Sequence, residues 1–347
     1  MNKLLLVSDA WHPQVNGVVT TLQITKEKLE DLGVEVYPLT PDGFRTVPLP
    51  TYPEIRLSIT SPSTIRRKIE AFGPDYVHIA TEGPLGMLAR KWCLSAGHPY
   101  TTSYHTRFPE YIAARAPVPL NWSYSFVRRF HNAGAGCMVS NTTLEKDLSD
   151  RGFTNLYRWV RGVDQTLFRT EVPPALDLPG PVFMYVGRVS VEKNIEAFLK
   201  LDLPGTKVVV GTGPSLESMK SRYPDTVFTG PKFGDDLVAH YRSADVFVFP
   251  SLTDTWGLVL LEAMACGVPV AAFPIMGPID VVADSGCGAL DTDLKKAALA
   301  ALDIPGDRCR AYAETFSWEA SAQQFLENVQ AANEAALSGQ LNSANAA

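Results

Sequence analysis

Two carboxylates and a glycine lie close together in one stretch of the sequence. Asp254 and Glu262 are eight residues apart, and Gly257 stands between them. The apolar run 245–250 predicts a buried strand, and residues 258–266 are strong helix formers. Asp254 would then lie in the turn and Glu262 about a turn and a half into the helix. From these positions two carboxylates can accept hydrogen bonds from two sets of sugar hydroxyls.

The predicted start of this helix favours binding of an anion. Its first backbone amides have no partner within the helix and lie at the positive end of the helix dipole. Gly257 allows close approach of a phosphate to the backbone. The alternative is that Asp254 only caps the helix and Glu262 is a solvated side chain. The candidate binding residues in this segment are Thr255, Trp256, Gly257, Leu258 and Val259.

Two cations follow another apolar run. The run 182–187 predicts a strand, and Gly187, Arg188 and Lys193 come at its end. A guanidinium and an ammonium that leave the same edge of a sheet suit a diphosphate. Alternatively, each cation pairs with a surface carboxylate.

The first half of the chain carries two further candidates. A predicted strand over 4–8 leads into a loop that contains Asn16 and Gly17, and a helix is expected over 18–32. Gly17 permits a ligand to approach the backbone, although a loop without a ligand is the other interpretation. His105 follows the predicted strand 100–104 and can hydrogen-bond a sugar, but a lone histidine is often structural.

No metal or disulfide chemistry is predicted. Asp291, Thr292 and Asp293 imitate an acidic metal-binding triplet, but they open a late helix, where aspartate is a common cap. The five cysteines are odd in number, widely spaced and without a CxxC pair, which indicates a reducing cytoplasmic environment. The apolar run 1–7 is too short for a signal peptide or a membrane-spanning helix.

Short apolar runs alternate with amphipathic segments along the whole chain. This alternation predicts parallel strands joined by helices, the pattern of a doubly wound α/β fold. Ligands of such sheets bind at the carboxyl ends of the strands, where the candidate residues fall. Besides the strands named above, we expect strands over 34–39, 76–80, 136–140, 207–211 and 268–273.

The length of 347 residues predicts two domains. Hydrophobic residues make up 46% and charged residues 20%, as in a folded globular protein. Proline and glycine cluster without periodicity between the two series of strands, which predicts a linker. The expected parts are an N-terminal domain over 1–168, a linker over 169–180, a second domain over 181–316, a C-terminal helix over 317–338 and a loose tail over 339–347.

The net charge of −6 is divided unevenly between the halves. Residues 1–164 hold 18 Lys and Arg against 15 Asp and Glu, whereas the remainder holds 13 against 22. A basic half with exposed aromatic residues suits an anionic membrane surface, and no nucleic-acid partner is indicated. In the alternative, Trp122 and Phe126 pack into the core and the arginines are solvated. The candidate acceptor or membrane face comprises Arg66, Arg67, Lys68, Arg107, Arg115, Trp122, Arg128 and Arg129.

Several of these segments occur in the order found in one large family. The loop with Asn16 and Gly17, the stretch 104–106, the stretch 161–164, Gly187-Arg188 with Glu192-Lys193 and the block 250–269 resemble the retaining glycosyltransferases of family 4. The resemblance implies the GT-B architecture of two facing Rossmann-like domains, with the C-terminal helix packing back on the N-terminal domain. It also implies that the domain over 1–168 binds the acceptor and that the domain over 181–316 binds the nucleotide sugar. Within the family, the chain is most similar to bacterial diacylglycerol glycosyltransferases and GDP-mannose-dependent α-mannosyltransferases.

The resemblance also implies a role for each matching residue. Glu262 would hold the ribose and Asp254 the hexose, although Asp254 replaces the glutamate of the family motif. Arg188 and Lys193 would neutralise the diphosphate in place of a metal, so neither a metal nor another cofactor is expected. Gly17 would contact the distal phosphate and His105 the hexose.

The activity implied is transfer of a hexose, with retention, from UDP-glucose or UDP-glucuronate to a lipid such as diacylglycerol. Such an enzyme would work in the cytoplasm, at the inner face of the membrane. Two alternatives stay open: a GDP-mannose-dependent α-mannosyltransferase acting on a lipid or soluble glycan, and a nucleotide-sugar-binding protein without turnover.

Overall fold

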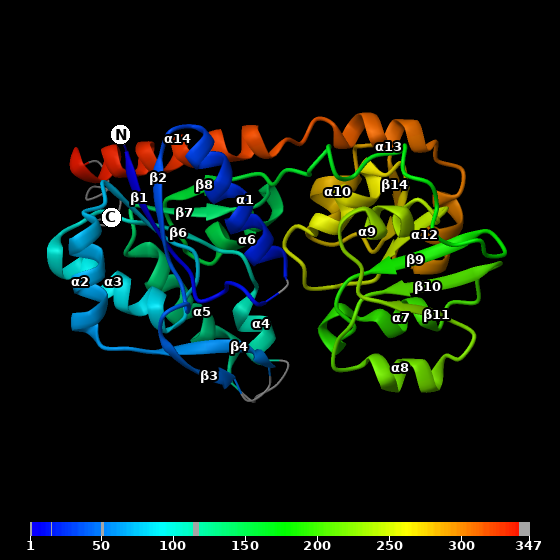
Figure 1. Cartoon of the computed structure of the whole chain (residues 1–347), viewed down its shortest axis with the longest axis horizontal. Coiled ribbons are helices and arrows are strands. Elements are labelled where there is room, and N and C mark those ends of the chain that lie inside the picture. The colour runs from blue at the N-terminus through cyan, green and yellow to red at the C-terminus, as the bar shows by residue number, and fades with distance from the viewer. Residues whose placement is uncertain (1, 15, 50–51, 114–117, 340–347) are drawn as a thin grey trace. The chain divides into compact units, whose positions relative to one another are not determined.

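The computed structural model describes residues 2–14, 16–49, 52–113 and 118–339 (Figure 1). Its contacts divide the chain into two compact units. Unit 1 comprises Met1–Val160 and Trp318–Ala347, and unit 2 comprises Arg161–Ser317. Each unit is built around one parallel sheet, as the alternation of apolar and amphipathic segments predicts.

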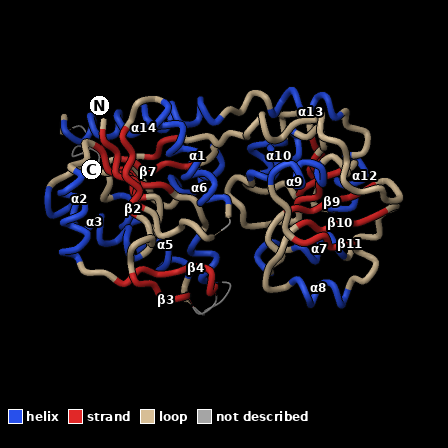
Figure 2. The backbone as a smooth tube through the Cα atoms, viewed as in Figure 1, coloured by secondary structure: helices blue, strands red, loops and turns tan. Residues whose placement is uncertain are grey.

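The sheet of unit 1 has six parallel strands in the order β2-β1-β5-β6-β7-β8. Two of them, β2 and β7, are labelled among the red strands of Figure 2. From β1 the chain moves to one edge at β2, and it then returns to form β5, β6, β7 and β8 on the other side of β1. The order therefore reverses between β1 and β5. The strands are β1 (Lys3–Val7), β2 (Glu35–Leu39), β5 (Tyr76–Ile79), β6 (Thr101–Ser103), β7 (Gly136–Val139) and β8 (Leu156–Arg158).

Helices cover both faces of this sheet because alternate residues of a strand point to opposite sides. Leu4 and Leu6 of β1 belong to the core on the side of α1 and α14, whereas Leu5 and Val7 belong to the core on the side of α2 and α3. The helices of unit 1 are α1 (Gly17–Asp31), α2 (Pro62–Phe72), α3 (Pro84–Ala96), α4 (Phe108–Ala113), α5 (Leu120–Asn132), α6 (Thr142–Asp150) and α14 (Trp318–Leu337).

The last helix, α14, packs on unit 1, as predicted for the C-terminal helix. Its apolar stripe of Ala322, Phe325 and Val329 is buried at 0% exposure. Trp159, also fully buried, lies with its ring 4.7 Å from that of Phe325 and donates its Nε1 hydrogen to Ser321. The core of unit 1 thus depends on residues far apart in the sequence.

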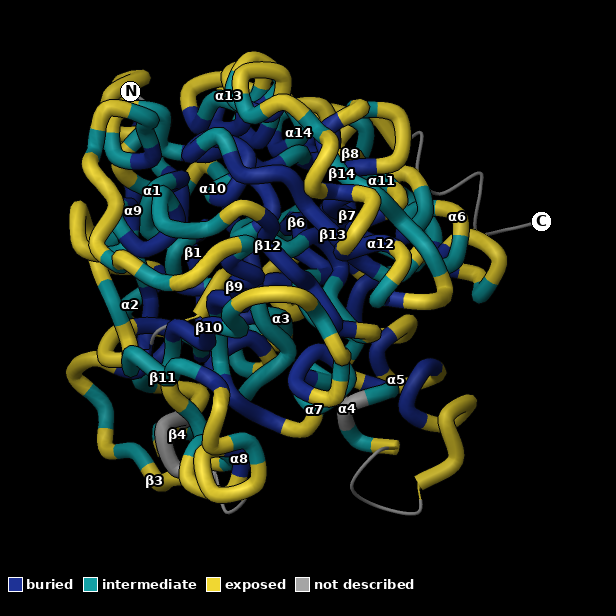
Figure 3. The backbone as a smooth tube through the Cα atoms, turned by 90° about the vertical axis from the view of Figure 1, so that its right-hand side faces the viewer, coloured by how far each residue is buried: buried dark blue, intermediate teal, exposed yellow. Residues whose placement is uncertain are grey.

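Unit 2 repeats the arrangement with the order β11-β10-β9-β12-β13-β14. All its strands are parallel, and β12 and β13 are buried throughout (Figure 3). The strands are β9 (Val182–Val186), β10 (Thr206–Val210), β11 (Val227–Gly230), β12 (Val246–Phe249), β13 (Val270–Ala272) and β14 (Gly288–Leu290). The helices are η1 (Val191–Lys193), α7 (Ile195–Leu199), α8 (Leu216–Arg222), α9 (Gly234–Tyr241), α10 (Leu258–Ala265), α11 (Pro278–Val282), α12 (Leu294–Ala301) and α13 (Gly306–Ala313).

The structure contains strands that the sequence pattern does not reveal. An antiparallel hairpin of β3 (Arg45–Leu49) and β4 (Tyr52–Ile59) stands outside the main sheet of unit 1. Prolines at 48, 50 and 53 obscure it, since proline interrupts a strand pattern. The edge strands β8, β11 and β14 are also absent from the predicted set, because none of them contains a long apolar run.

The chain passes between the units at Val160–Arg161 and again at Ser317–Trp318. The proline- and glycine-rich segment 169–180 has no helix or strand, but it lies within unit 2, where the Ala175 amide donates to Ala239 O of α9. The prediction of irregular backbone over 169–180 is confirmed, but this segment does not connect the two units. The functional roles assigned to the two domains remain predictions.

Candidate active site

The order of the strands in unit 2 reverses between β9 and β12, which are neighbours in the sheet. In doubly wound folds, the crevice at the carboxyl ends of two such strands is where ligands bind. The loops at this position are 187–194 after β9 and 250–257 after β12. They carry the cations and the first carboxylate identified in the sequence.

The two loops are joined by side chains from both. Lys193 Nζ lies 2.5 Å from Asp254 Oδ1. Asn194 Nδ2 donates to Pro250 O at 3.0 Å, and Thr253 Oγ1 donates to Glu192 O at 3.2 Å. The structure thus brings Lys193 and Asp254 together, although 61 residues separate them.

Arg188 lies at the start of the first loop, with its side chain one-third exposed. Its Nε is 3.8 Å from Glu192 Oε1, and the Tyr185 hydroxyl donates to Arg188 O at 2.8 Å. Gly187, just before it, has a φ of 149°, and a Cβ there would meet the Tyr185 hydroxyl at 2.9 Å. Tyr185 therefore positions the backbone from which Arg188 projects.

The turn after β12 has the conformation expected of an anion site. Gly257 has a φ of 84° and precedes α10, whose N-terminus has no side-chain cap. The amides of Leu258 and Val259 begin this helix. Thr255 and Trp256 are 9% and 7% exposed, so this turn is held in the body of the unit.

Several buried polar atoms near this turn have no hydrogen-bond partner within the described structure. They are Asp254 Oδ2, Trp256 Nε1, Ser251 Oγ and Ser190 Oγ. Buried polar groups normally have a partner, and each exception needs an explanation. These atoms mark the turn as a candidate binding site.

Glu262 lies one turn along α10 and accepts a hydrogen bond from the Tyr241 hydroxyl at 2.9 Å. Burial raises the pKa of Glu262 to about 7, although the Tyr241 hydrogen bond opposes this shift. Tyr241, at the end of α9, is fully buried. The sequence shows no sign of this partner, because only packing of α9 against α10 brings the two residues together.

A third loop, after β13, lies against the Asp254 turn. Gly277 has a φ of 88°, and a Cβ there would lie 3.1 Å from Trp256 O and 3.2 Å from Asp254 O. A larger residue would have to displace the turn that carries Asp254. The loop's neighbour α11 begins at Pro278.

In unit 1 the predicted phosphate loop is in part a helix cap. Asn16 Oδ1 accepts hydrogen bonds from the amides of Val18 and Val19, both at 3.0 Å, and α1 begins at Gly17. The backbone of this loop is exposed at Gly17. The side-chain oxygen of Asn16, Oδ1, is occupied by its two hydrogen bonds to α1. Asp9 supports the same loop, because its carboxylate accepts from the amides of Leu85 and Gly86.

His105 follows β6 and is partly buried. Its ring lies edge-on to Trp159, 5.8 Å between centroids. Tyr104, just before it, is fully buried, and burial raises the pKa of its hydroxyl. The structure thus places His105 at the carboxyl edge of the first sheet, one strand beyond the point where the strand order reverses.

The predicted acceptor face divides into two kinds of residue. Arg107 is 22% exposed and pairs with Glu110 at 2.6 Å, so it belongs to an internal network. Glu110 also accepts from the Tyr124 hydroxyl at 2.5 Å. Trp122 and Phe126, in contrast, are 73% and 55% exposed, and the alternative that they pack into the core is wrong.

The remaining cations of that face lie on the surface with varied partners. Arg66 pairs with Glu70 at 2.7 Å, and Arg128 Nη1 donates to Arg151 O. Lys68 Nζ lies 5.5 Å from the centre of the Phe44 ring. Arg67 and Arg129 are exposed, and Arg115 lies outside the described residues.

The acidic triplet has the structural role that the sequence indicates. Asp293 caps α12, and its Oδ1 accepts from the Lys295 amide at 3.0 Å. Asp291 Oδ1 accepts from the Asp293 amide at 2.8 Å. Both carboxylates are thus engaged in shaping the turn that precedes the helix.

Two family descriptions match the chain, one in each half. Glycosyltransferase Family 4 matches residues 15–167, and Glycosyl transferases group 1 matches residues 180–304. A GDP-mannose-dependent alpha-mannosyltransferase of Mycolicibacterium smegmatis is 30% identical over 88% of this chain and 86% of its own length. The chain belongs to glycosyltransferase family 4.

Two further relatives are similar over much of the chain. The sulfoquinovosyl transferase of Arabidopsis thaliana is 34% identical, with 73% of this chain and 53% of that protein covered. The alpha-monoglucosyldiacylglycerol synthase of Streptococcus pneumoniae is 26% identical, with 93% and 83% covered. As a family 4 glycosyltransferase, the protein transfers sugar from a nucleotide sugar.

Solved structures agree with the fold of this family 4 member. Sucrose-phosphate synthase from Thermosynechococcus elongatus superposes with a TM-score of 0.73 at 21% identity, covering 99% of this chain and all of that one. The two parallel-sheet units are those of the GT-B architecture, as predicted. Within the described residues, no helix combines the length and apolar character needed to cross a membrane.

Proposed function

We propose that this glycosyltransferase binds its nucleotide diphosphate sugar at the β9/β12 edge of unit 2 and transfers a hexose to a lipid acceptor. The observation that carries the proposal is the contact of Lys193 with Asp254, 2.5 Å apart, beside the uncapped start of α10. A cation, a carboxylate and free helix amides converge there. These are the groups needed to hold a phosphate next to a sugar hydroxyl.

Each side chain has a proposed task at this edge. Arg188 and Lys193 neutralise the diphosphate, and the amides of Leu258 and Val259 add partial positive charge. Asp254 binds hexose hydroxyls and Glu262 binds the ribose. Lys193 also holds Asp254 in place, so binding of the diphosphate and of the hexose is coupled through this pair.

The proposed reaction retains the anomeric configuration and uses no metal. The bond from the anomeric carbon to the diphosphate oxygen breaks as the acceptor oxygen attacks from the same face. The departing phosphate oxygen takes the acceptor proton. Catalysis then rests on positioning and on stabilisation of the departing charge by Arg188 and Lys193.

Two observations favour a lipid acceptor. The exposed pair Trp122 and Phe126 on α5 lies one helical turn apart, with Arg129 on the same side. Such a face suits insertion at an anionic membrane surface. The similarity to a monoglucosyldiacylglycerol synthase points to diacylglycerol as the acceptor, at the inner face of the cytoplasmic membrane.

UDP-glucose and UDP-glucuronate are the donors we favour, and GDP-mannose is the second candidate. The second candidate rests on the 30% identity to a GDP-mannose-dependent alpha-mannosyltransferase. The test offers UDP-glucose, UDP-galactose, UDP-glucuronate and GDP-mannose, each with diacylglycerol in detergent, and follows products by thin-layer chromatography. A glycolipid formed from a UDP-sugar supports the proposal. A mannolipid supports the second candidate, and the absence of a lipid product with every donor contradicts the lipid assignment.

A further inference from the structure

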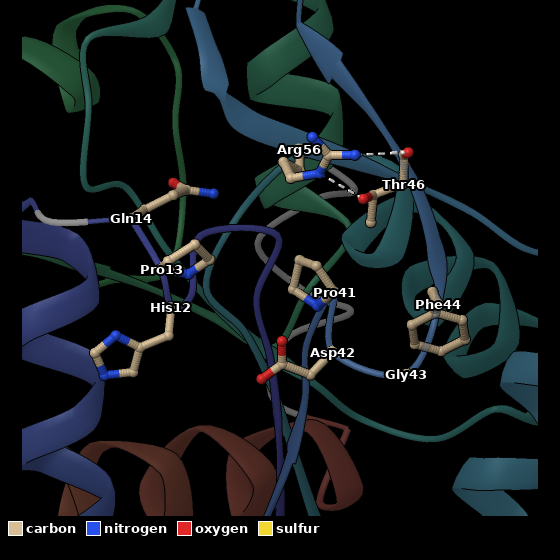
Figure 4. Close-up of a pocket in the computed structure, with 9 residues that line it drawn as sticks. All are labelled: His12, Pro13, Gln14, Pro41, Asp42, Gly43, Phe44, Thr46 and Arg56. Atoms are coloured by element: carbon tan, nitrogen blue, oxygen red, sulfur yellow. Dashed lines mark hydrogen bonds between the residues drawn. The ribbon is translucent and has the colours of Figure 1, made fainter.

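Unit 1 contains a small polar cavity next to its predicted phosphate loop (Figure 4). Its walls come from the loop after β1, the loop after β2 and the β3–β4 hairpin. The cavity measures about 190 Å³, smaller than pockets that enclose drug-sized ligands. It can hold one small polar group, and it is too small for acyl chains. Its polar and aromatic lining includes His12, Gln14, Asp42, Phe44, Thr46 and Arg56.

Arg56 is held in position at the cavity by its neighbour on the hairpin. Its Nε donates to Thr46 Oγ1 at 2.6 Å and its Nη2 donates to Thr46 O at 3.0 Å (Figure 4). Among the described side chains, no carboxylate lies within ion-pair distance of this guanidinium. The remaining donors of Arg56 can therefore bind an anionic oxygen without breaking an ion pair.

The cavity lining carries the guanidinium of Arg56, and a further cation lies next to it. Lys68 Nζ lies 5.5 Å from the ring centre of Phe44, which lines the cavity. Asp42 adds one carboxylate, which can accept hydrogen bonds from hydroxyl groups. A group with hydroxyls and a single negative charge would match both kinds of side chain.

We propose that this cavity binds the polar head of an acceptor lipid, and that the head carries hydroxyl groups and one negative charge. This inference rests on the proposed function, since it assigns the acceptor side of the same reaction. The loop that contributes His12 and Gln14 leads within a few residues to Gly17. A head bound in the cavity would thus be held beside the loop predicted to face the donor phosphate.

Transfer to a series of acceptors tests the charge of the head. The acceptors share one diacylglycerol and carry no head, a neutral hexose, a uronic acid or a glycerol phosphate. We expect Arg56→Gln to raise the acceptor KM about tenfold or more for the charged heads, with the donor KM unchanged. The matched control is Arg45→Gln, on the same hairpin but outside the cavity lining. An equal effect on neutral and charged heads, or no effect, overturns the inference.

The two charged heads distinguish a carboxylate from a phosphate as the source of the negative charge. Asp42→Asn should raise the KM for acceptors whose heads carry hydroxyls and leave the KM for bare diacylglycerol unchanged. Thermal melting of each variant shows whether it folds like the wild-type protein. An Arg56→Gln protein that does not fold would be replaced by Arg56→Lys, for which we expect partial loss with the same selectivity for charged heads.

A binding measurement separates failure of this inference from failure of the proposed function. Calorimetry with methyl glucuronide, glycerol phosphate and methyl glucoside probes the cavity without any transfer. In one outcome, the wild-type protein transfers sugar to no lipid and yet binds a charged probe that the Arg56→Gln variant does not bind. That result would contradict the proposed function and support the assignment of the cavity. If lipids accept sugar but none of the charged probes binds, the cavity assignment is wrong.

Discussion

The hydroxyl of Tyr241 donates a hydrogen bond to Glu262 Oε2 at 2.9 Å, joining α9 to the carboxylate that we assign to the ribose. Tyr241 is fully buried, so its ring is held by the packing of unit 2. Tyr241 is therefore a positioning residue for Glu262. It fixes the orientation of the carboxylate and lowers its pKa relative to burial alone.

Replacing Tyr241 by phenylalanine should weaken donor binding. Loss of a hydrogen bond to a charged group costs about 1.5–3 kcal/mol, so the donor KM should rise roughly tenfold or more while kcat changes less. Because the pKa of Glu262 would also rise, the acid limb of the pH profile should move to higher pH. Steady-state kinetics between pH 5.5 and pH 9 would measure both effects. A lower kcat with unchanged KM and an unchanged pH profile would instead indicate a purely structural role.

The pKa of Glu262, raised to about 7 by burial, predicts how stability depends on pH. A carboxyl whose pKa is raised on folding contributes stability below its unfolded value of about 4.5, and this contribution is lost as the pH rises through about 7. Glu262→Gln removes the buried charge, so the variant should be more stable than the wild type at pH 8 and similar to it at pH 5. Urea unfolding at the two pH values checks this. Equal differences at both would show that Glu262 does not titrate there.

Removing the guanidinium of Arg188 should slow transfer strongly. Loss of one electrostatic donor to a developing charge typically lowers the rate about 10²–10³-fold, so kcat/KM of Arg188→Ala should fall by that order. Arg222→Ala provides the control, because that arginine pairs with Glu196 on the surface of the same unit.

EDTA should leave the wild-type rate unchanged, and restoration of activity by a divalent metal would contradict the metal-free mechanism.

Membrane binding should depend on the exposed aromatic pair of α5. Burying each ring at an interface stabilises binding by roughly 1.5–3 kcal/mol, so Trp122→Ser with Phe126→Ser should release the protein from vesicles of phosphatidylglycerol and phosphatidylcholine. Leu94→Ser is the matched control, since Leu94 is 50% exposed on another helix of unit 1. Flotation measures the bound fraction. Equal binding of the double variant and the wild type would show that α5 does not contribute to membrane binding.

A buried ion pair in unit 1 should contribute to stability. His131 Nε2 lies 3.0 Å from Glu82 Oε1, and the ring is fully buried. Burial lowers the pKa of His131, but its contacts with Cys137 and Glu82 raise the pKa to about 10 overall. Leaving a buried charge unpaired costs about 3–5 kcal/mol, so Glu82→Gln should lower the free energy of unfolding by roughly that amount at neutral pH.

The pH dependence of this pair has the opposite sign to that of Glu262. A histidine with a raised pKa contributes stability below about 6.5, and this stability is lost as the pH rises through about 10. The effect of Glu82→Gln should therefore shrink toward pH 10. Lys146→Gln is the control, because its pair with Asp150 is exposed to solvent and should contribute little to stability. A Glu82→Gln effect as small as this control would show that the pair is not buried in solution.

Much of the fold follows from local patterns in the sequence. The central strands β1, β9 and β12 are almost entirely apolar because both faces of a parallel sheet are covered by helices. The start of α10 is equally local, since Gly257 and the helix formers after it are adjacent. The hairpin of β3 and β4 and the edge strands β8, β11 and β14 could not be found in this way. Their side chains are less buried, so burial imposes no clear pattern on their sequences.

Residue types and spacing by themselves identified the loops that carry chemistry: a carboxylate and a glycine after one strand, and two cations after another. Only the tertiary structure decided which side chains meet. It placed Lys193 against Asp254, Tyr241 against Glu262 and Arg56 over a cavity lined by His12. The physical reason is that the order of strands in a sheet, and not distance along the chain, sets which loops are neighbours. That order is fixed by the packing of both faces of the sheet as a whole.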